Sequence, residues 1–338
     1  IDPFSYSRRV THEMANFGHH QVPRVINDFS SKEKITPASL FSLGYAYSVP
    51  LDKWNITDTA CDYIFMGDQT IDFEIPGTLG LIFNHNVWKT QQHKEQMYPL
   101  IAVHDYLSGV EKSDKLNFIN ATLSELSSEL ITRLQPDKTV VLIIHTQNEH
   151  ALAELRRIFV EFMNNHCTVP IVIRRDYADL SEEQLQLYAA TDLGGLLIDG
   201  LGDGIFLTAT NSGSDKLLNN TSFNILQATR TRISKTEYIS CPSCGRTLFD
   251  LQETTARIRS RTYHLKGIKI GIMGCIVNGP GEMADADYGY VGSGPGRITL
   301  YRGKEVVKRN VQAAKAVDEL IGIIREDGNW IEPVLNES

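Results

Sequence analysis

Three cysteines and one glutamate in the last hundred residues could hold a metal ion or an iron–sulfur cluster. Cys241 and Cys244 form a Cys-x-x-Cys pair, and Cys275 opens a glycine-rich stretch that ends at Glu282. Soft metal centres select thiolates, and two thiolates on one turn can grip one centre from a shared loop. Three thiolates leave a tetrahedral metal or a four-iron cluster one ligand short, and Glu282 is the nearest strong candidate for that place.

The cysteine spacing alone leaves other interpretations open. Cys241, Cys244 and Cys275 could form a structural zinc site with His264, or the Cys-x-x-Cys pair could be a redox disulfide. A pure electron-transfer module is a further possibility, although four cysteines usually close its cluster. Cys61 lies in an apolar run, where an inert core thiol is the default.

The two motifs together resemble a known family. Cys241-Pro-Ser-Cys244-Gly-Arg-Thr, with Cys275-Ile-Val-Asn-Gly-Pro-Gly-Glu282 after it, closely resembles the 4-hydroxy-3-methylbut-2-enyl diphosphate synthases. The resemblance runs from about Leu196 to the C-terminus, and it is strongest to the plant-like form with an extra middle domain. It favours a cluster over zinc, because the Asn-Gly-Pro-Gly-Glu loop is long and compositionally unusual. It implies a 4Fe-4S cofactor held by Cys241, Cys244, Cys275 and Glu282.

The resemblance also implies a reaction. The family are iron–sulfur oxidoreductases of the non-mevalonate pathway of isoprenoid biosynthesis. They reduce 2-C-methyl-D-erythritol 2,4-cyclodiphosphate by two electrons, with ring opening and loss of water, to 4-hydroxy-3-methylbut-2-enyl diphosphate. Ferredoxin or flavodoxin supplies the electrons. By motif position, Glu282 is expected to give up its place to the substrate and Asn278 to face the substrate, so both are catalytic candidates. Arg246 could pair with a substrate phosphate or be structural.

A basic run follows the Cys-x-x-Cys pair in the sequence. Its members are Arg257, Arg259, Arg261, Lys266 and Lys269. The run is either a solvated helix face or a docking surface for an acidic ferredoxin, in which case the reduction rate should depend on salt.

Composition narrows the class of protein. The chain has 338 residues, of which 42% are hydrophobic and 22% charged, values typical of a soluble globular protein with room for two domains. No apolar run approaches the length of a membrane span, and a net charge of −8 does not suggest a nucleic-acid partner. No signal-peptide pattern opens the chain, and five cysteines, an odd number, do not suggest a secreted disulfide framework. A reducing cytoplasm is the predicted compartment.

Apolar runs alternate with amphipathic ones between about Gly80 and Thr208. The runs that read as buried strands begin at Gly80, Leu100, Val140, Val169 and Leu196. Residues 150–164 have helical spacing, and Ser181 with Gln184 predicts a capped helix. Strands that alternate with helices imply parallel pairing, and the pattern favours a complete or degenerate α/β barrel over a doubly wound sheet. The segment from Gly200 to Gly204 reads as a tight turn.

The last hundred residues predict a smaller α/β domain with its cysteines on loops at strand ends. Helices are expected at 247–265 and 311–324, and strands at 268–273, 288–291 and 297–301. The predicted class is therefore α/β, a barrel-like (β/α) insertion domain followed by a smaller iron–sulfur domain. The predicted parts are an insertion or middle domain at 1–220, a connecting helix and linker at 221–237, and a 4Fe-4S cluster domain at 238–338.

The chain begins at Ile1 without a methionine, and no segment matches the N-terminal barrel that holds the diphosphate in this family. We expect a piece of a longer polypeptide whose cluster domain works with an N-terminal barrel domain of the same or another chain. On that expectation the 338 residues are inactive alone.

Overall fold

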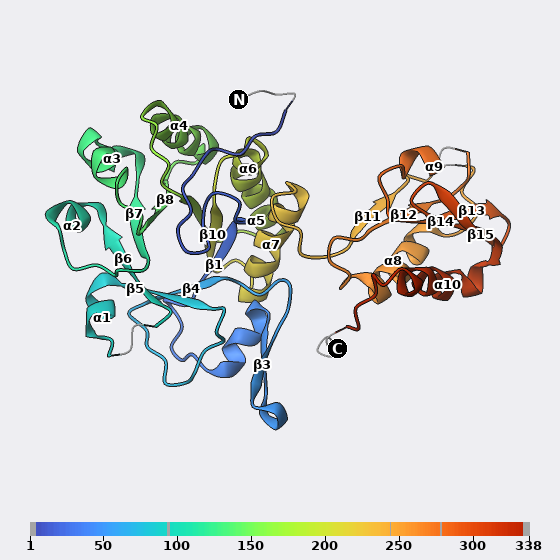
Figure 1. The fold of residues 1–338 in the computed structure, drawn as a ribbon, viewed down its shortest axis with the longest axis horizontal. Helices are drawn as coiled ribbons and strands as arrows, with labels where there is room; N and C mark the ends of the chain where they lie inside the picture. Colours follow the sequence, from blue (N-terminus) through green and yellow to red (C-terminus); the bar gives the residue numbers. More distant parts are fainter. Residues whose placement is uncertain (1–4, 93–94, 244, 278, 334–338) are drawn as a thin grey trace. The chain divides into compact units, whose positions relative to one another are not determined.

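The structure is a computed structural model that describes residues 5–92, 95–243, 245–277 and 279–333. The chain divides into two compact units, Ile1–Arg232 and Ile233–Ser338. Both units combine helices with a sheet, as Figure 1 shows. The predicted class, a barrel-like α/β part followed by a smaller α/β part, is confirmed.

The first unit is a barrel. Within the described residues, eight parallel strands close in the order β1, β10, β9, β8, β7, β6, β5 and β4. The strands are β1 (Arg24–Asp28), β4 (Tyr63–Gly67), β5 (Gly80–Asn84), β6 (Met97–Ala102), β7 (Asn117–Ala121), β8 (Val140–Ile144), β9 (Ile171–Ala178) and β10 (Gly204–Thr210). The β1–β10 pair closes the ring through the register Ile26 to Phe206.

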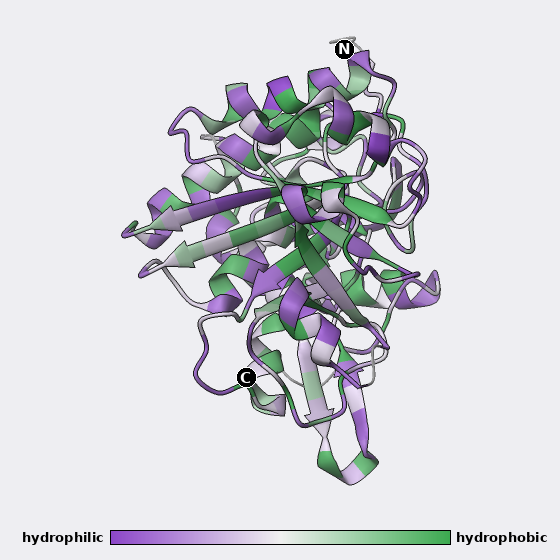
Figure 2. Cartoon of the chain, turned by 90° about the vertical axis from the view of Figure 1, so that its left-hand side faces the viewer, coloured by the Kyte–Doolittle hydropathy of each residue, from purple (hydrophilic) through white to green (hydrophobic). Residues whose placement is uncertain are grey.

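Two apolar layers explain why these segments become strands. Inside the barrel, alternate strand residues such as Ile82, Phe118 and Val172 form one buried cluster. The intervening residues face outward and join the helices in a second cluster. A strand buried on both faces has to be apolar throughout, which is why Val140-Val-Leu-Ile-Ile carries no polar side chain. Figure 2 shows the alternation of hydrophobic and hydrophilic residues along the surrounding helices.

Helices and short turns connect the barrel strands. The α-helices are α1 (His85–Thr90), α2 (Val103–Ser108), α3 (Ser128–Leu134), α4 (Ala151–Asn164), α5 (Glu182–Ala189), α6 (Gly195–Ile198) and α7 (Asp215–Ala228). Other turns are η1 (Pro37–Leu43), η2 (Val49–Leu51), η3 (Leu123–Glu125) and the π-helical η4 (Ala190–Gly194), and a hairpin joins β2 (Tyr45–Ser48) to β3 (Lys53–Ile56). The predicted cap of α5 is confirmed, because Ser181 and Gln184 form a capping box.

The segment before β1 covers the amino ends of the barrel strands. Phe17 is fully buried; its ring stacks on Tyr63 at 5.2 Å and meets Phe118 edge-on at 5.8 Å. The Tyr63 hydroxyl donates to Asn16 Oδ1 at 2.6 Å, and Arg24 Nε donates to the Asn16 carbonyl at 2.6 Å. An aromatic side chain from outside the sheet therefore completes the inner layer at this end.

Some predicted elements differ from the structure. The Leu196 run, predicted as a strand, is helix α6, in which Leu196 and Leu197 are buried; with Leu193 of the preceding η4 they have helical spacing. An apolar run of three residues is too short to show whether the segment is a strand or a buried helix. The predicted tight turn is confirmed: Gly200 and Gly202 have φ values of 75° and 113°, and β10 follows directly.

The second unit contains a mixed sheet. Among its described residues the order is β11 (Glu237–Ser240), β12 (Lys269–Met273), β13 (Tyr288–Gly294), β14 (Arg297–Arg302) and β15 (Glu305–Gln312). The first three strands are parallel and the last two pairings antiparallel. Helices α8 (Leu251–Thr262) and α10 (Ala313–Glu326) share one buried cluster with the sheet, and α9 (Gly279–Glu282) leads to Met283 in a separate cluster.

The last predicted helix, 311–324, begins later in the structure: Val311 belongs to strand β15, and α10 begins at Ala313. The helical part of segment 221–237 belongs to α7, which packs against β1 and β10 of the barrel. Arg232 is held there by Asp62 Oδ2 at 2.5 Å and the Pro23 carbonyl at 3.1 Å, so the division of the units falls after this arginine. No described helix is both long and apolar enough to cross a membrane.

Replacing Phe17 by alanine should lower the free energy of unfolding by about 3–5 kcal/mol, because a buried aromatic ring is lost and a cavity remains. Denaturant unfolding of the chain, followed by circular dichroism, measures this change. The matched control is Val10→Ala in the same segment, where the side chain is 77% exposed and a change below about 0.5 kcal/mol is expected. A loss below 1 kcal/mol for Phe17→Ala would contradict the role of this ring.

Candidate functional site

The two described cysteines of the motif lie at one edge of the second sheet. Cys241 directly follows β11, and Cys275 follows β12 after one glycine. These strands are adjacent and parallel, with Ser240 beside Ile272, so their carboxyl ends meet at the same edge. Both thiols are partly buried and free of disulfides. The topology therefore brings together two loops that are far apart in the sequence.

A hydrogen bond links these loops. The Gly274 amide donates to Cys241 Sγ at 3.2 Å, and the Cys241 amide reaches the Ile272 carbonyl at 3.4 Å. Cys241 also touches apolar residues of both buried clusters of the unit. Amide donors on cysteine sulfur and a largely apolar shell are features that tune iron–sulfur clusters. The described donor set thus fits a thiolate-held cluster.

Glycine permits the close approach of the strands behind the cysteines. A Cβ on Gly292 would lie 2.4 Å from the Gly274 carbonyl oxygen, and one on Gly274 would lie 2.8 Å from the Thr247 side chain. The Leu248 amide donates to the same Gly274 carbonyl at 3.2 Å. Backbone from three segments is therefore packed tightly around the residue that precedes Cys275.

Of the other predicted site residues, the structure describes Glu282 and Arg246 but not Cys244 and Asn278. Glu282 is the exposed last residue of α9, and Arg246 is exposed. Cys244 and Asn278 lie outside the described residues. No three His, Cys, Asp or Glu side chains are gathered closely enough to hold a metal ion in the described part of the chain. The structure therefore pairs Cys241 with the Cys275 loop and leaves the four-ligand set as a prediction.

His264, the fourth ligand of the zinc interpretation, lies elsewhere. It follows the C-terminal end of α8. There the Tyr263 carbonyl accepts a hydrogen bond from the amide of Thr236, which immediately precedes β11. Its Nε2 is 2.8 Å from the Ile331 carbonyl, and its ring packs edge-on against Trp330. Cys241 is at the carboxyl end of that strand, so the structure does not favour a zinc site that includes His264.

The isolated cysteines have a different environment. Cys61 and Cys167 are buried in the barrel unit, and burial raises the pKa of both thiols. A raised thiol pKa keeps the neutral form, which neither binds metal nor attacks electrophiles. Both cysteines serve as core residues, as the sequence indicates for Cys61.

A cavity of about 670 Å³ lies beside Cys241. One stripe of α8 forms its wall, with Thr255 and Arg259 among the lining residues. Arg259 is held over the Tyr238 ring at 5.3 Å, whereas Arg261 pairs with Asp318 of α10 at 2.5 Å. Residues two apart in a helix point about 200° apart. The basic run therefore does not form one face, and only Arg259 of its members lines this cavity.

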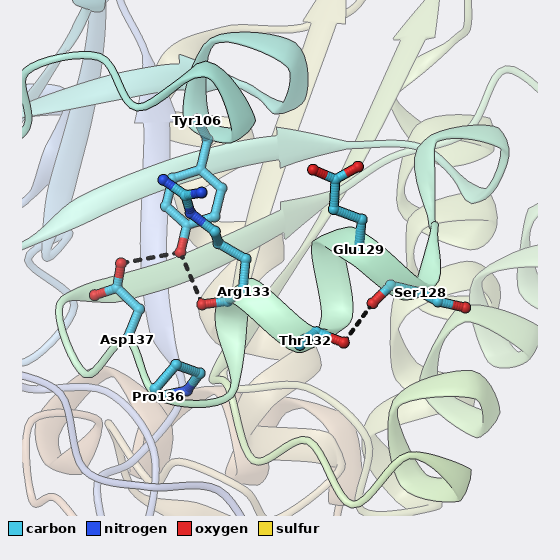
Figure 3. Close-up of a pocket in the computed structure, with 7 residues that line it drawn as sticks. All are labelled: Tyr106, Ser128, Glu129, Thr132, Arg133, Pro136 and Asp137. Atoms are coloured by element: carbon cyan, nitrogen blue, oxygen red, sulfur yellow. Dashed lines mark hydrogen bonds between the residues drawn. The ribbon is translucent and has the colours of Figure 1, made fainter.

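Two further cavities lie in the barrel unit. One, of about 660 Å³, lies between α2 and α3. Figure 3 shows the Tyr106 hydroxyl of this cavity directed at Asp137, to which it donates at 2.9 Å. A larger one of about 1280 Å³ lies between α4 and α5. On its floor Arg175 and Tyr177 both donate to Asp192 Oδ2, at 2.9 and 2.7 Å. In each cavity the named polar groups thus bind one another, and no motif in the sequence marks either cavity.

Both the second unit and the chain as a whole are similar to known proteins. Residues 237–326 match the family model described as GcpE protein C-terminal domain. A Parabacteroides distasonis protein named 4-hydroxy-3-methylbut-2-en-1-yl diphosphate synthase (flavodoxin) is 42% identical over 332 residues, which are 98% of this chain and 50% of that protein. Over nearly its whole length, the chain is similar to one half of this synthase.

Other members support the assignment. The Bacteroides thetaiotaomicron synthase (flavodoxin) is 40% identical over 334 residues, 97% of this chain and 50% of that protein. The Arabidopsis thaliana synthase (ferredoxin), chloroplastic, is 55% identical over 179 residues, 53% of this chain and 24% of that protein. The chain spans about half the length of the bacterial synthases it matches. The family resemblance seen in the cysteine motifs is thus confirmed.

Replacing Gly292 by alanine should displace the Gly274 carbonyl, because the added Cβ has no room beside it. We expect a loss of about 1–3 kcal/mol in the unfolding free energy of the second unit and a shifted Gly274 amide signal in nuclear magnetic resonance spectra. Gly294→Ala is the matched control, since its Cβ would meet only Arg297 Cβ at 3.8 Å. Equal effects of the two substitutions would refute the proposed tight packing behind the cysteines.

Proposed function

We propose that this chain forms part of a 4-hydroxy-3-methylbut-2-en-1-yl diphosphate synthase. The reaction is the two-electron reduction of 2-C-methyl-D-erythritol 2,4-cyclodiphosphate, with ring opening and loss of water, in the non-mevalonate pathway. The observation that carries the proposal is the meeting of Cys241 with the Cys275 loop inside the segment that matches the family model. A reducing cytoplasm is the proposed compartment, because thiolate ligands must stay reduced.

The proposed cofactor is a 4Fe-4S cluster held by Cys241, Cys244, Cys275 and Glu282. When bound, the cluster supplies electrons one at a time to the substrate. The Gly274 amide withdraws charge from the Cys241 sulfur through its hydrogen bond, which favours the reduced state. Glu282 is a harder and more exchangeable ligand than cysteine, so the proposed role of this exposed carboxylate is to make way for the substrate.

Arg246 and Asn278 are the proposed substrate-binding residues of this unit. Arg246 is exposed, so its guanidinium is available to a diphosphate. Asn278 belongs to the motif between Cys275 and Glu282, and its amide can both donate to and accept from a substrate hydroxyl. The two residues would orient the substrate beside the exchangeable position.

The proposed electron donor is ferredoxin or flavodoxin. The names of the Parabacteroides and Arabidopsis relatives specify flavodoxin and ferredoxin, respectively. Supporting features are the cavity beside Cys241 and Arg259 on its wall. Arg259 and Arg261 lie on different sides of α8, so we expect the rate of electron transfer from the donor to depend on salt only through a small number of charges.

The proposed arrangement needs a further domain. Around the cysteine edge, Leu248, Ile276 and Val277 are 37%, 50% and 62% exposed, an apolar group suited to another protein surface. We propose that an N-terminal barrel domain binds here and holds the cyclodiphosphate. We further propose that residues 1–220 are the insertion domain, 221–237 the connection and 238–338 the cluster domain. The first part of the connection packs on the barrel as the end of α7, and the residues after Arg232 lead into the second unit. The proposed role of the insertion domain is that of a spacer.

Anaerobic reconstitution tests the cofactor. With ferrous iron and sulfide, the chain should take up about four iron and four sulfide per molecule and absorb broadly near 400 nm. Cys241→Ser should reduce uptake severalfold, because a soft anchor is lost. Cys61→Ser and Cys167→Ser are matched controls, since both thiols are buried in the barrel unit. Zinc without sulfide in the wild-type chain would overturn the cluster.

Turnover tests the reaction. The reconstituted chain with dithionite should yield no product alone, and addition of the half of the Parabacteroides synthase that this chain does not match should restore product formation. In that mixture Glu282→Ala should lower kcat by at least about tenfold while the iron content is retained, because an exchangeable ligand is lost. Full activity of Glu282→Ala, or product from the chain alone, would contradict this division of labour.

A further inference from the structure

The carboxyl ends of the barrel strands carry polar residues on the inner face. Val172 of β9 belongs to the inner apolar cluster, and side chains alternate along a strand, so Arg174 and Asp176 face the same side. The same reasoning places Asn120 above Phe118, His145 above Ile143 and Thr208 above Phe206. We call Asn120, His145, Arg174, Asp176 and Thr208 the mouth arc.

Hydrogen bonds connect the mouth arc across neighbouring strands. Arg174 Nε and Nη2 each lie 2.8 Å from Asp176 Oδ1, and the Thr208 hydroxyl donates to the same oxygen at 2.6 Å. Asn120 Nδ2 lies 3.1 Å from His145 Nε2. The Arg174 guanidinium also covers the Phe206 ring at 4.9 Å. Each side chain is therefore held in place before any ligand arrives.

Part of the hydrogen-bonding capacity of the mouth arc is unused. Asn120 Oδ1 is buried and has no partner among the described residues. Asp176 Oδ2 and Arg174 Nη1 likewise bind no described residue. An unpaired buried polar atom costs roughly 1–3 kcal/mol. Since the layer below is filled by apolar side chains, the fold itself does not require polar residues at this level.

We propose that the mouth arc is a binding site for an uncharged polyhydroxylated small molecule, a polyol or a sugar. The carboxyl ends of the strands are where barrel proteins of this type place their ligands. Arg174 and Asp176 remain reachable from outside, with side chains 22% and 29% exposed. The free positions alternate between donor and acceptor, which suits hydroxyl groups, because a hydroxyl both donates and accepts.

The charges of the mouth arc argue against an anionic ligand. Arg174 is paired with Asp176, so the two formal charges cancel. Burial and the nearby Arg174 lower the pKa of His145, which keeps its imidazole neutral at pH 7. A phosphate would meet the Asp176 carboxylate with one guanidinium, already engaged, as its only cation within the arc. The site lies in the barrel unit and does not depend on the proposed reductase activity.

The test uses the whole chain with erythritol, xylitol and D-ribose as probes. Saturation-transfer magnetic resonance and calorimetry should detect at least one of them with a dissociation constant of about 1–10 mM. Arg174→Gln and Asp176→Asn should each weaken binding at least about tenfold. Asn120→Ala should weaken binding and lower the melting temperature by only a few degrees, because loss of the Nδ2–His145 hydrogen bond is offset by removal of the unpaired Oδ1. That combination distinguishes a binding residue from a structural one.

Arg157→Gln is the matched control. Arg157 forms an exposed pair with Glu161 on α4 and should leave binding unchanged. Absence of binding by all three probes at 100 mM would overturn the site. Equal binding by the wild type and the three mouth-arc variants would overturn the location, and tighter binding of ribose 5-phosphate than of ribose would overturn the proposed ligand class.

Discussion

The parallel pairing of β11 and β12 is the constraint on which the candidate centre depends. Because the strands run in the same direction, the chain leaves both of them at the same edge, and Cys241 and Cys275 arrive there together. The Gly274 amide then joins the two loops through the Cys241 sulfur. An antiparallel pairing would have sent the two cysteines to opposite edges.

The barrel unit relies on the same property of parallel strands. Its strands all leave the barrel at one end, so their last inward side chains lie there together, and some of the polar ones form the mouth arc. The opposite end is closed by Phe17, which supplies an apolar side chain where no strand residue is available. One end is thus built for packing and the other is free to carry polar groups.

Local sequence determined much of this protein. The Cys-x-x-Cys pair and the Asn-Gly-Pro-Gly-Glu loop pointed to the family because their residue types and order are unusual in combination. Apolar runs such as Val140–Ile144 predicted buried parallel strands, because burial on both faces leaves no polar position. Ser181 and Gln184 predicted the start of α5, because capping depends only on nearby residues.

Tertiary structure decided the rest. The Leu196 run is helical because the barrel buries its leucines at helical spacing, and β1 and β7 lack the long apolar run that would have marked them. Arg259 and Arg261 appeared as one basic run, yet α8 directs them to different neighbours. The sequence does not predict the mouth arc, because its members lie far apart along the chain, in β7, β9 and β10 and directly after β8. Spacing along the chain reports local geometry, whereas only strand order and register decide which distant side chains meet.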